Sequence, residues 1–378
     1  MTSTTLRALR KATRFLLCPV LLSGILFDTA PPSFAQVVED DASLVLDHPS
    51  PRVRRPETVF LETATHAGTR LVAAGEHGVI LVSDDDGLTW RQTSVPVLAT
   101  INEIRFSSDK IGWAVGHFGV VLRTDDAGEH WVRQLDGISG AQLVLREAQS
   151  AQSVAGVDGD RALRFAKRLV DDGPDKPLFL VDVLSDTHVR VFGADGLAYE
   201  SVDSGKSWSD WRSHLANPRR LNLYGMIHRD TLMVVAGEQG LLMRGDPDQT
   251  LASVTPPYDG SLFGIVDGGV AGMHVFGLLG HDFVSKDDGV TWTAIQNGST
   301  QSLTAALRLN DGQLIFSDMG GMIYKIDGSS LERIPLAIGW SISEMTLTPS
   351  GSLLVVGAGG LKRIPAAELS RALSGGQS

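Results

Sequence analysis

The stretch Arg70–Trp90, RLVAAGEHGVILVSDDDGLTW, is repeated at Ile111–Trp131 as IGWAVGHFGVVLRTDDAGEHW. Five shorter or weaker copies end at Trp208 and Trp292 or surround the turns at 237–240, 318–321 and 357–360. Counted at the second glycine of each turn (78, 119, 196, 240, 280, 320 and 360), the copies are 41, 77, 44, 40, 40 and 40 residues apart. A nearly fixed period of this length indicates an architecture built from repeated structural units.

Each copy follows the same order of local patterns. A β-rich run leads into a Gly-x-x-Gly turn, and a second β-rich run leads into an acidic turn followed by Trp or another apolar residue. A further alternating run, such as Ile101–Phe106, precedes each copy. Four strands in about 40 residues is the period of one β-propeller blade. We therefore predict an all-β fold, a seven-bladed β-propeller with four-stranded blades, over residues 57–366.

The long step of 77 residues contains a segment of different character. Ala162, Phe165, Ala166, Leu169 and Val170 have the spacing of one helix face. We predict a helical hairpin at about residues 141–172, inserted between blades 2 and 3; a degenerate eighth blade is the alternative. Residues 36–56 form an N-terminal segment in which we expect a strand near 43–47 to close the ring. Residues 367–378 form a C-terminal tail that begins with a helical pattern.

The first 35 residues have the pattern of a signal peptide. Four basic residues precede the uncharged run Phe15–Phe27, and a small-residue frame ends at Ala35. We predict cleavage before Gln36 and export to the periplasm or another extracytoplasmic space; an N-terminal core helix is the alternative. The only cysteine, Cys18, is lost with this segment, so the mature chain has no disulfide. No later apolar run approaches the roughly 20 residues of a membrane span.

The charge of the chain bears on its partners. The formal net charge is −11, and removal of the signal peptide makes it −14. A nucleic-acid scaffold needs an excess of Lys and Arg on at least one face, so we expect no nucleic-acid partner. His77 and His117 fall in turns of adjacent repeats, but no third ligand at a defined spacing accompanies them. We therefore predict no metal site and no cofactor.

Four of the acidic turns share the pattern Ser/Thr-x-Asp-x-Gly-x-x-Trp. In such a turn the carboxylate and the hydroxyl can bond backbone N–H groups, while Gly takes a positive φ and Trp packs between blades. We assign this structural role to Asp85, Gly87, Trp90, Asp126, Gly128, Trp131, Asp203, Gly205, Trp208, Asp287, Gly289 and Trp292. The corresponding segments of blades 4, 6 and 7 lack the pattern.

These turns resemble the Asp-box, or BNR, repeats of sialidases and other propellers. With a Gly-x-x-Gly turn ahead of each Asp box, residues 58–365 more closely resemble the photosystem II stability/assembly factor family. The helical insert and the segments GPDKP, NPRRLNLYG and PYDGSLFG resemble a bacterial branch of that family, sometimes labelled glycosyl-hydrolase-like. The resemblance implies a propeller that assists the assembly of a membrane complex.

Strand order in a propeller places the Gly-x-x-Gly turns and the blade-to-blade connections on one face, around the channel mouth. Binding sites usually lie on such concave, loop-built faces; a solvated polar rim is the alternative. Our candidate binding residues are Arg219, Arg220, Tyr224, Tyr258, Lys176, Glu76, His77, His117, Asp195 and Glu238, with Arg308 nearby. The first four are the favoured contacts, because arginine and tyrosine are enriched at interface hot spots.

Two functions fit these patterns. The favoured one is an exported, non-catalytic scaffold that docks a membrane protein or membrane complex, with photosystem assembly implied by the resemblance alone. The alternative is an Asp-box glycosidase. A sialidase needs three arginines and a tyrosine nucleophile with its glutamate, and no arginine set at matching blade positions is evident. We therefore assign no catalytic residue.

Overall fold

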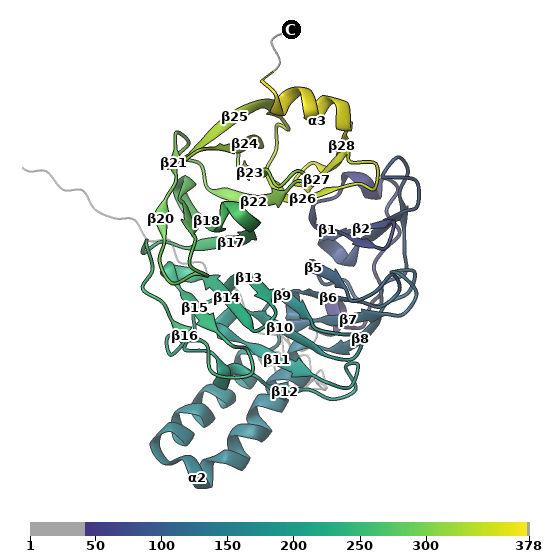
Figure 1. The fold of residues 1–378 in the computed structure, drawn as a ribbon. Coiled ribbons are helices and arrows are strands. Elements are labelled where there is room, and N and C mark those ends of the chain that lie inside the picture. The colour runs from purple at the N-terminus through teal and green to yellow at the C-terminus, as the bar shows by residue number, and fades with distance from the viewer. Residues whose placement is uncertain (1–41, 376–378) are drawn as a thin grey trace, which may run out of the picture.

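The structure, a computed structural model, describes residues 42–375, apart from the side chains of residues 152–158. Within this range the chain is mostly β and forms seven sheets arranged as a ring (Figure 1). The predicted signal peptide and its cleavage site lie outside the described residues.

The sheets follow one another along the chain, and we number them 1 to 7. Sheets 1 and 2 contain β1 (Leu61–Ala67), β2 (Arg70–Gly75), β3 (Ile80–Ser83) and β4 (Arg91–Gln92), then β5 (Ile101–Phe106), β6 (Gly112–Gly116), β7 (Val121–Thr124) and β8 (Val132–Leu135). Sheets 3 and 4 contain β9 (Leu178–Val183), β10 (Val189–Gly193), β11 (Ala198–Ser201) and β12 (Ser209–Asp210), then β13 (Leu223–Arg229), β14 (Leu232–Gly237), β15 (Leu242–Gly245) and β16 (Ala252–Ser253).

Sheet 5 contains β17 (Leu262–Asp267), β18 (Met273–Gly277), β19 (Asp282–Ser285) and β20 (Thr293–Ala294). Sheet 6 contains β22 (Leu303–Arg308), β23 (Leu314–Asp318), β24 (Met322–Asp327) and β25 (Ser330–Ala337), and β21 (Gln296–Asn297) pairs in parallel with β25. Sheet 7 has three strands, β26 (Ile342–Leu347), β27 (Leu353–Gly357) and β28 (Gly360–Ile364). The first strand of each sheet faces the centre of the ring (Figure 1).

The Gly-x-x-Gly turns join the second and third strands of the sheets. In the first of them His77 has φ 55° and Gly78 has φ 68°, and the Val79 N–H donates to the Glu76 carbonyl over 3.1 Å. Two successive positive φ values make a tight hairpin turn whose twist matches the strands. Short 3-10 turns mark these positions: η2 (Glu76–Gly78), η3 (His117–Gly119), η4 (Ala194–Gly196), η6 (Glu238–Gly240) and η8 (Leu278–Gly280).

Sheet 6 departs from this pattern. The residue with φ 76° is Gly321, whereas the repeat spacing was counted at Gly320, so the sequence register is one residue off here. Asp318 replaces the first glycine of the turn and is buried. Its carboxylate accepts hydrogen bonds from the Gly320 and Met322 N–H groups at 2.9 and 3.0 Å. The aspartate thus fixes the turn by side-chain bonds.

The turns that carry the Ser/Thr-x-Asp-x-Gly-x-x-Trp pattern share the hydrogen bonds of the aspartate and the hydroxyl, and the first three also share that of the indole. The buried Trp292 N–H of the fourth has no partner among the described residues. We call these four segments, 83–90, 124–131, 201–208 and 285–292, the tryptophan turns. In the second, Asp126 accepts from the His130 N–H at 2.9 Å and from the Thr124 hydroxyl at 2.9 Å. The Gly128 N–H donates to the Thr124 hydroxyl at 3.0 Å, and the Trp131 indole donates to the Gly128 carbonyl at 3.1 Å. In these turns the aspartate and the hydroxyl therefore bind backbone N–H groups of the turn.

Replacing Asp126 with alanine is expected to lower the free energy of unfolding by about 1 to 3 kcal/mol, because the turn amides lose their acceptor. These hydrogen bonds, against the opposing effect of burial, hold the pKa of Asp126 below its usual 3.8. The contribution is therefore present above pH 3.8 and is lost as the pH falls. Urea unfolding at pH 7 and pH 3 measures both effects. Asp125→Ala is the control, since Asp125 is mostly exposed and pairs only with Arg123; an equal loss in the two variants would contradict the assigned role.

The helical segment between sheets 2 and 3 is α2 (Gly137–Asp172), which begins four residues before the predicted limit and ends at it. Asp136 caps it by accepting from the Ser139 N–H at 2.9 Å. A Cβ on Gly137 would lie 2.4 Å from the Pro174 carbonyl oxygen, so the two ends of the segment meet. Figure 1 shows it leaving the ring as two arms that lie side by side. Residues from both arms join one buried cluster with Leu197 and Tyr199 of sheet 3.

The predicted strand at residues 43–47 is wrong, because residues 42–46 are helical. This helix buries Ala42 and Leu46, which lie one turn apart on the same side, against the first two sheets. Arg133 of β8 fixes its end by donating to the Leu46 carbonyl at 2.6 Å. Within residues 42–56, the N-terminal segment therefore contacts the ring by side-chain packing and adds no strand to sheet 7.

Side chains join sheets 1 and 7 where the ring closes. Asp86, in the first tryptophan turn, accepts from the Ser350 N–H at 2.8 Å and is paired with Arg363 at 2.5 Å. The His66 ring nitrogen lies 2.7 Å from the Leu347 carbonyl oxygen. The C-terminal helix α3 (Ala366–Leu373), which follows β28 as the sequence predicted, buries apolar side chains against sheet 6. The remaining 3-10 turns are η1 (Pro56–Thr58), η5 (Arg212–His214) and η7 (Gly269–Ala271).

Candidate functional site

The Gly-x-x-Gly turns and the sheet-to-sheet connections lie on the same face, as predicted. A Cβ on Gly78 would lie 2.2 Å from the Val97 carbonyl oxygen, and one on Gly240 would lie 2.4 Å from that of Tyr258. Val97 and Tyr258 belong to the connections that leave sheets 1 and 4. We call this side the connection face, and the side that carries the tryptophan turns the opposite face.

Several predicted binding residues form hydrogen bonds with the residues that precede the innermost strands. Glu76 accepts from the Phe60 N–H at 3.2 Å, and Glu238 accepts from the Asn222 N–H at 3.2 Å. The Asp195 N–H donates to the side-chain oxygen of Asn222 at 2.9 Å. His77 is exposed in its turn. These residues lie in sheets 1, 3 and 4, so the fold does not gather them into one site.

Other predicted residues make contacts within the connections. Tyr258 stacks on His281 with 4.0 Å between ring centroids. Arg219 is exposed and donates to the Gln239 side chain. Lys176 pairs with Asp175 at 2.7 Å, and its side chain is largely buried.

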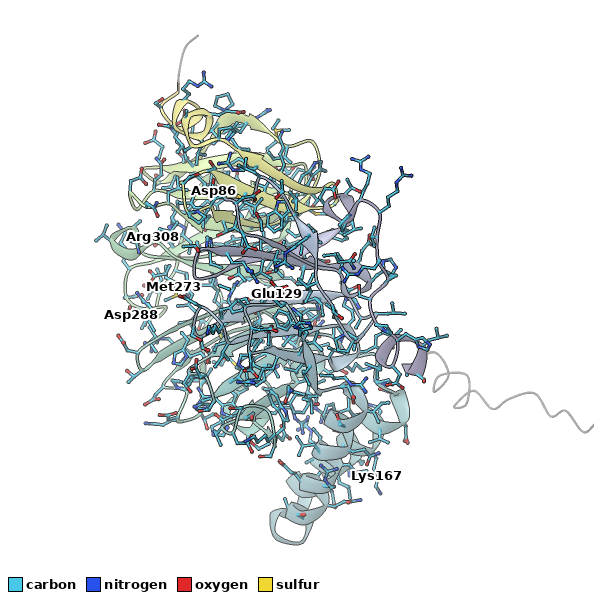
Figure 2. The ribbon with its side chains drawn as sticks, turned by 90° about the vertical axis from the view of Figure 1, so that its right-hand side faces the viewer. Asp86, Glu129, Lys167, Met273, Asp288 and Arg308 are labelled. Carbon is cyan, nitrogen blue, oxygen red and sulfur yellow. The ribbon has the colours of Figure 1, made fainter. Side chains whose placement is uncertain are left out.

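Arg308 does not lie where the sequence placed it. β22 begins at the connection face and ends at Arg308, so this side chain lies at the opposite face, beside Gly269. Figure 2, which shows the ring from the side, has Arg308 and Asp288 of a tryptophan turn on the same side of the molecule. The prediction was wrong because β22 spans the thickness of the ring, so its last residue lies on the face opposite to that of its first residue.

Three guanidinium groups surround one phenyl ring at the base of α2. The Cζ atoms of Arg220, Arg212 and Arg168 lie 4.0, 4.6 and 5.9 Å from the centroid of the Phe165 ring. Arg220 belongs to the connection between sheets 3 and 4, so α2 and this connection meet here. With Arg161 these residues form what we call the arginine cluster. Arg220 therefore points toward α2, and the residues that line the central cavity do not include it.

The arginine cluster is a region of concentrated positive charge in an acidic chain. Burial lowers the pKa of Arg220, and the charges of Arg168, Arg212 and Arg161 lower it further. Arg212 is compensated by Asp210, which accepts from its Nε at 2.8 Å. The cluster extends along the second arm of α2 through exposed Arg164 and Lys167, the latter labelled in Figure 2.

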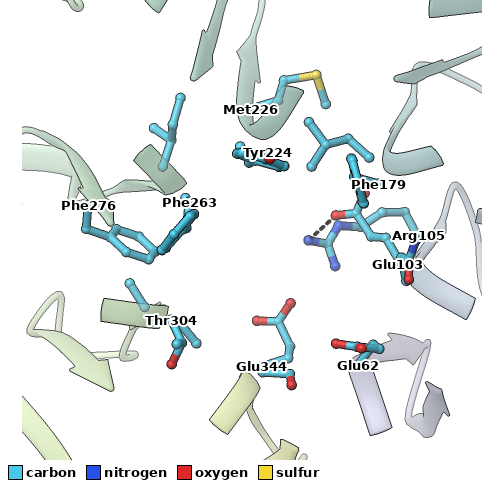
Figure 3. Close-up of a pocket in the computed structure, with 18 of the residues that line it drawn as sticks. Glu62, Glu103, Arg105, Phe179, Tyr224, Met226, Phe263, Phe276, Thr304 and Glu344 are labelled. Atoms are coloured by element: carbon cyan, nitrogen blue, oxygen red, sulfur yellow. Dashed lines mark ion pairs between the residues drawn. The ribbon is translucent and has the colours of Figure 1, made fainter. Parts of the chain in front are cut away.

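A cavity of about 440 Å³ occupies the centre of the ring and is lined by the first strands of all seven sheets (Figure 3). Of the predicted residues, Tyr224 and His117 line it. Because His117 lies in a Gly-x-x-Gly turn, the cavity opens toward the connection face. Tyr224 stands between Phe179 and Phe263, with ring centroids 5.5 and 6.0 Å away.

Sequence reasoning missed the charged residues of this cavity. Glu62 on β1, Glu103 and Arg105 on β5, and Glu344 on β26 all line it. Arg105 pairs with Glu103 at 2.7 Å, and Glu103 also accepts from the Val181 N–H at 2.5 Å. Glu62 directly follows the first buried residue of β1, where the alternation of a strand turns a side chain toward the channel. Glu103 and Glu344 lie one residue further along their strands, just after a register shift that the alternation of the sequence does not reveal.

Burial raises the pKa of Glu344 to about 7, since Arg105 only partly offsets the cost of burying its charge and Glu103 adds to it. The folded protein therefore keeps a proton on Glu344 up to about pH 7, whereas the unfolded chain releases it near pH 4.5. It follows that this residue favours folding below pH 4.5 and that its contribution is lost as the pH rises to 7.

Glu344→Gln is therefore expected to raise the free energy of unfolding by about 1 to 3 kcal/mol at pH 8 and to leave it nearly unchanged at pH 4. Denaturant unfolding at the two pH values measures this difference. Glu368→Gln, an exposed position on α3, is the control. A glutamine variant that is less stable than the wild type at pH 8 would show that ionised Glu344 is favourably paired.

The sequence matches no protein-family model, and the search of curated proteins found no match. Solved structures do match. The structure of the WD40 β-propeller domain of Doa1 aligns with a TM-score of 0.57 at 11% identity, over 86% of this chain and 98% of that one. The fold is a β-propeller.

Two further structures similar to this propeller are of YCF48. The first, described as YCF48 bound to D1 peptide, has a TM-score of 0.60 at 14% identity and covers 82% of this chain and 94% of that chain. The second, YCF48 from Cyanidioschyzon merolae, has a TM-score of 0.60 at 15% identity, with coverages of 83% and 96%. At these identities the likeness concerns the fold.

Two searches within residues 42–375 bear on the candidate sites. No group of three or more His, Cys, Asp or Glu side chains placed to hold a metal ion was found among the described residues. In the same part of the propeller, no helix has the length and apolar character needed to cross a membrane.

Proposed function

We propose that this protein is an exported, non-catalytic scaffold that docks an acidic segment of a membrane protein or membrane complex at the extracytoplasmic surface. In this proposal the propeller has seven blades, the tryptophan turns are Asp boxes, and α2 is an insertion between blades 2 and 3. Docking takes place on the connection face, at the arginine cluster beside α2.

The arginine cluster carries this proposal. Arg168 and Arg220 share the Phe165 ring with Arg212, and burial together with the mutual repulsion of these cations lowers the pKa of Arg220. A carboxylate-bearing partner relieves that repulsion and can bond planar guanidinium groups in pairs. Arginine beside an aromatic ring is also a combination enriched at interface hot spots.

The charge of the opposite face supports the same orientation. Its tryptophan turns expose Asp84, Asp125 and Asp288, whose side chains are 54, 67 and 67% exposed. Each of these carboxylates is paired with an arginine, Arg70, Arg123 and Arg229 respectively, so this face presents its cations in ion pairs. We therefore expect an acidic partner to favour the arginine cluster. The similarity to YCF48 adds a precedent, since one YCF48 structure is described as bound to D1 peptide.

The proposal that the protein is exported depends on its first 35 residues. Their basic start, apolar run and small-residue frame at Ala35 follow the order of a secretory signal. Intact-mass measurement of the exported protein is expected to give a chain that begins at Gln36; retention of Cys18 would exclude cleavage.

The docking proposal is tested with the double charge reversal Arg168→Glu/Arg220→Glu. We expect a fluorescein-labelled peptide of alternating Asp, Glu and Gly to bind the wild type and to lose about tenfold or more in affinity for the variant. The same variant is expected to lose crosslinked capture of a membrane protein from native membranes. Arg308→Glu, which reverses one charge instead of two and lies on the opposite face, is the control.

Circular dichroism establishes that each variant is folded. Equal peptide affinity in the wild type and the double variant would place the docking site elsewhere. A loss of binding free energy in Arg308→Glu that is half the loss in the double variant would show that only net charge matters.

An Asp-box glycosidase is the second candidate, and the cavity carboxylates favour it. Glu344, with its pKa raised to about 7, has the property of a general acid, and Glu62 and Glu103 line the same space. Turnover of a panel of 4-methylumbelliferyl glycosides that is lost in Glu344→Gln would replace the scaffold proposal with this one.

A further inference from the structure

The central cavity has two chemically different walls. One wall is aromatic: Phe179, Tyr224 and Phe263 form a row across three neighbouring sheets, with Phe276 beside it (Figure 3). The facing wall bears the carboxylates of Glu62, Glu103 and Glu344, and Figure 3 shows those of Glu62 and Glu344 pointing into the open space. The cavity is thus apolar on one side and acidic on the other.

The charges within the cavity do not balance. Arg105 is the cation among the lining residues, and its ion pair is with Glu103. Ser343 bonds the Glu62 carboxylate, whereas the hydrogen bond to the Glu344 carboxylate comes from the adjacent Met345 N–H over 3.2 Å. When all three carboxylates are ionised, these residues and Arg105 carry a net negative charge of two, so a bound cation would offset part of it.

A compact organic cation can interact with the aromatic wall and the acidic wall at the same time. Aromatic faces attract ammonium groups through their quadrupole, and carboxylates add direct attraction and hydrogen bonds. A volume of about 440 Å³ is in the range of small-ligand sites. The opening beside His117 lets such a group enter from the connection face.

We propose that the central cavity is a binding site for an organic ammonium ion, held by Glu344 and Glu62 against the aromatic row Phe179, Tyr224 and Phe263. The ligand is either a free amine with a small apolar body or the ammonium group of a lysine side chain in a peptide. This site is separate from the arginine cluster and does not depend on the proposed docking function.

The site is tested by calorimetric titration of the full mature chain at pH 8 with phenethylammonium chloride and with 2-phenylethanol, which has similar shape but no charge. A tripeptide, N-acetyl-Ala-Lys-Ala-amide, and its ε-acetylated counterpart form the second arm. We expect the charged member of at least one pair to bind, with its uncharged counterpart about tenfold weaker or not detected. The arm that binds identifies the source of the ammonium group.

Two variants with opposite expected effects locate the site. Glu344→Gln removes a carboxylate that points into the open space and is expected to weaken ammonium binding about tenfold or more. Arg105→Gln removes the competing cation and is expected to strengthen it several-fold. Glu368→Gln, on the surface of α3, is the matched control and should leave the affinity unchanged.

Affinity is also expected to rise with pH as Glu344 ionises. The other titratable groups that line the cavity are Glu62 on β1, Glu103 and Arg105 on β5, His117 in its turn and Tyr224 on β13. A rise between pH 6 and 8 that persists in His117→Gln and disappears in Glu344→Gln assigns the effect to Glu344. The proposal is overturned if neither charged probe binds, if charged and uncharged probes bind equally, or if Glu344→Gln binds as the wild type does.

Discussion

Replacing Trp131 with alanine is expected to lower the free energy of unfolding by about 3 to 5 kcal/mol, the range for large aromatic truncations in packed cores. The side chain is 4% exposed and belongs to the cluster between sheets 1 and 2, with Val72 and Val82 on the first and Leu122 on the second. It also meets Phe106 edge-on, with ring centroids 6.3 Å apart. The substitution opens a cavity between two sheets and leaves the Gly128 carbonyl without its indole partner.

Trp90→Ala is the matched control for this experiment, since Trp90 occupies the same place in the first tryptophan turn but is only half-buried. Its loss should be clearly smaller in urea unfolding followed by fluorescence or circular dichroism. Equal losses would mean that the turn hydrogen bond dominates and that burial between sheets matters little. Acidic-peptide binding by folded Trp131→Ala protein should be unchanged.

Replacing Gly116 with alanine is expected to cost about 3 kcal/mol or more, because the added methyl group overlaps the backbone itself. A Cβ at this position would lie 2.1 Å from the Thr100 carbonyl oxygen, just before β5. Flexible side chains can move away from an intruding methyl group, but this carbonyl belongs to the innermost strand segment and accepts a bond from the His117 N–H at 2.9 Å. To make room for the methyl group, the backbone at Gly116 would have to move away from Thr100 and weaken this hydrogen bond.

Gly298→Ala is the control, because a Cβ there meets no atom within 4 Å. Thermal unfolding should separate the two variants by several degrees or more. A Gly116→Ala protein as stable as the Gly298→Ala protein would show that the connection can shift at little cost.

Much of the propeller could be predicted from the sequence because the repeated residues act locally. A glycine that must approach a carbonyl, as Gly116 does, or an aspartate that must accept turn amides, as Asp126 does, leaves the same pattern in each copy. In sheet 6, Asp318 replaces the glycine and holds the turn by side-chain hydrogen bonds. There the register predicted from the glycine spacing was wrong by one residue. The strand expected at 43–47 also failed, because a short amphipathic helix and a short strand cannot be told apart from five residues.

The candidate site was predicted less well because it depends on which side chains distant segments bring together. Arg220 was identified, but its neighbours Arg168 and Arg212 come from α2 and from the end of sheet 3. Glu344 lies some 240 residues from Glu103 in the chain, and each occupies an ordinary strand position. Only the closed ring places them in one cavity.

The junction between sheets 1 and 7 also has a consequence for how the molecule folds. Neighbouring sheets elsewhere join segments roughly 40 residues apart, except across α2, whereas the bonds from Asp86 to Ser350 and Arg363 span 264 and 277 residues. Closing a loop of that length costs about 5 kcal/mol of chain entropy, so the arc of sheets forms first and this junction forms last. Until it closes, the arc carries two unpaired faces that fit those of a second arc. The same junction at which the ring becomes complete is therefore the point at which two copies can exchange sheets.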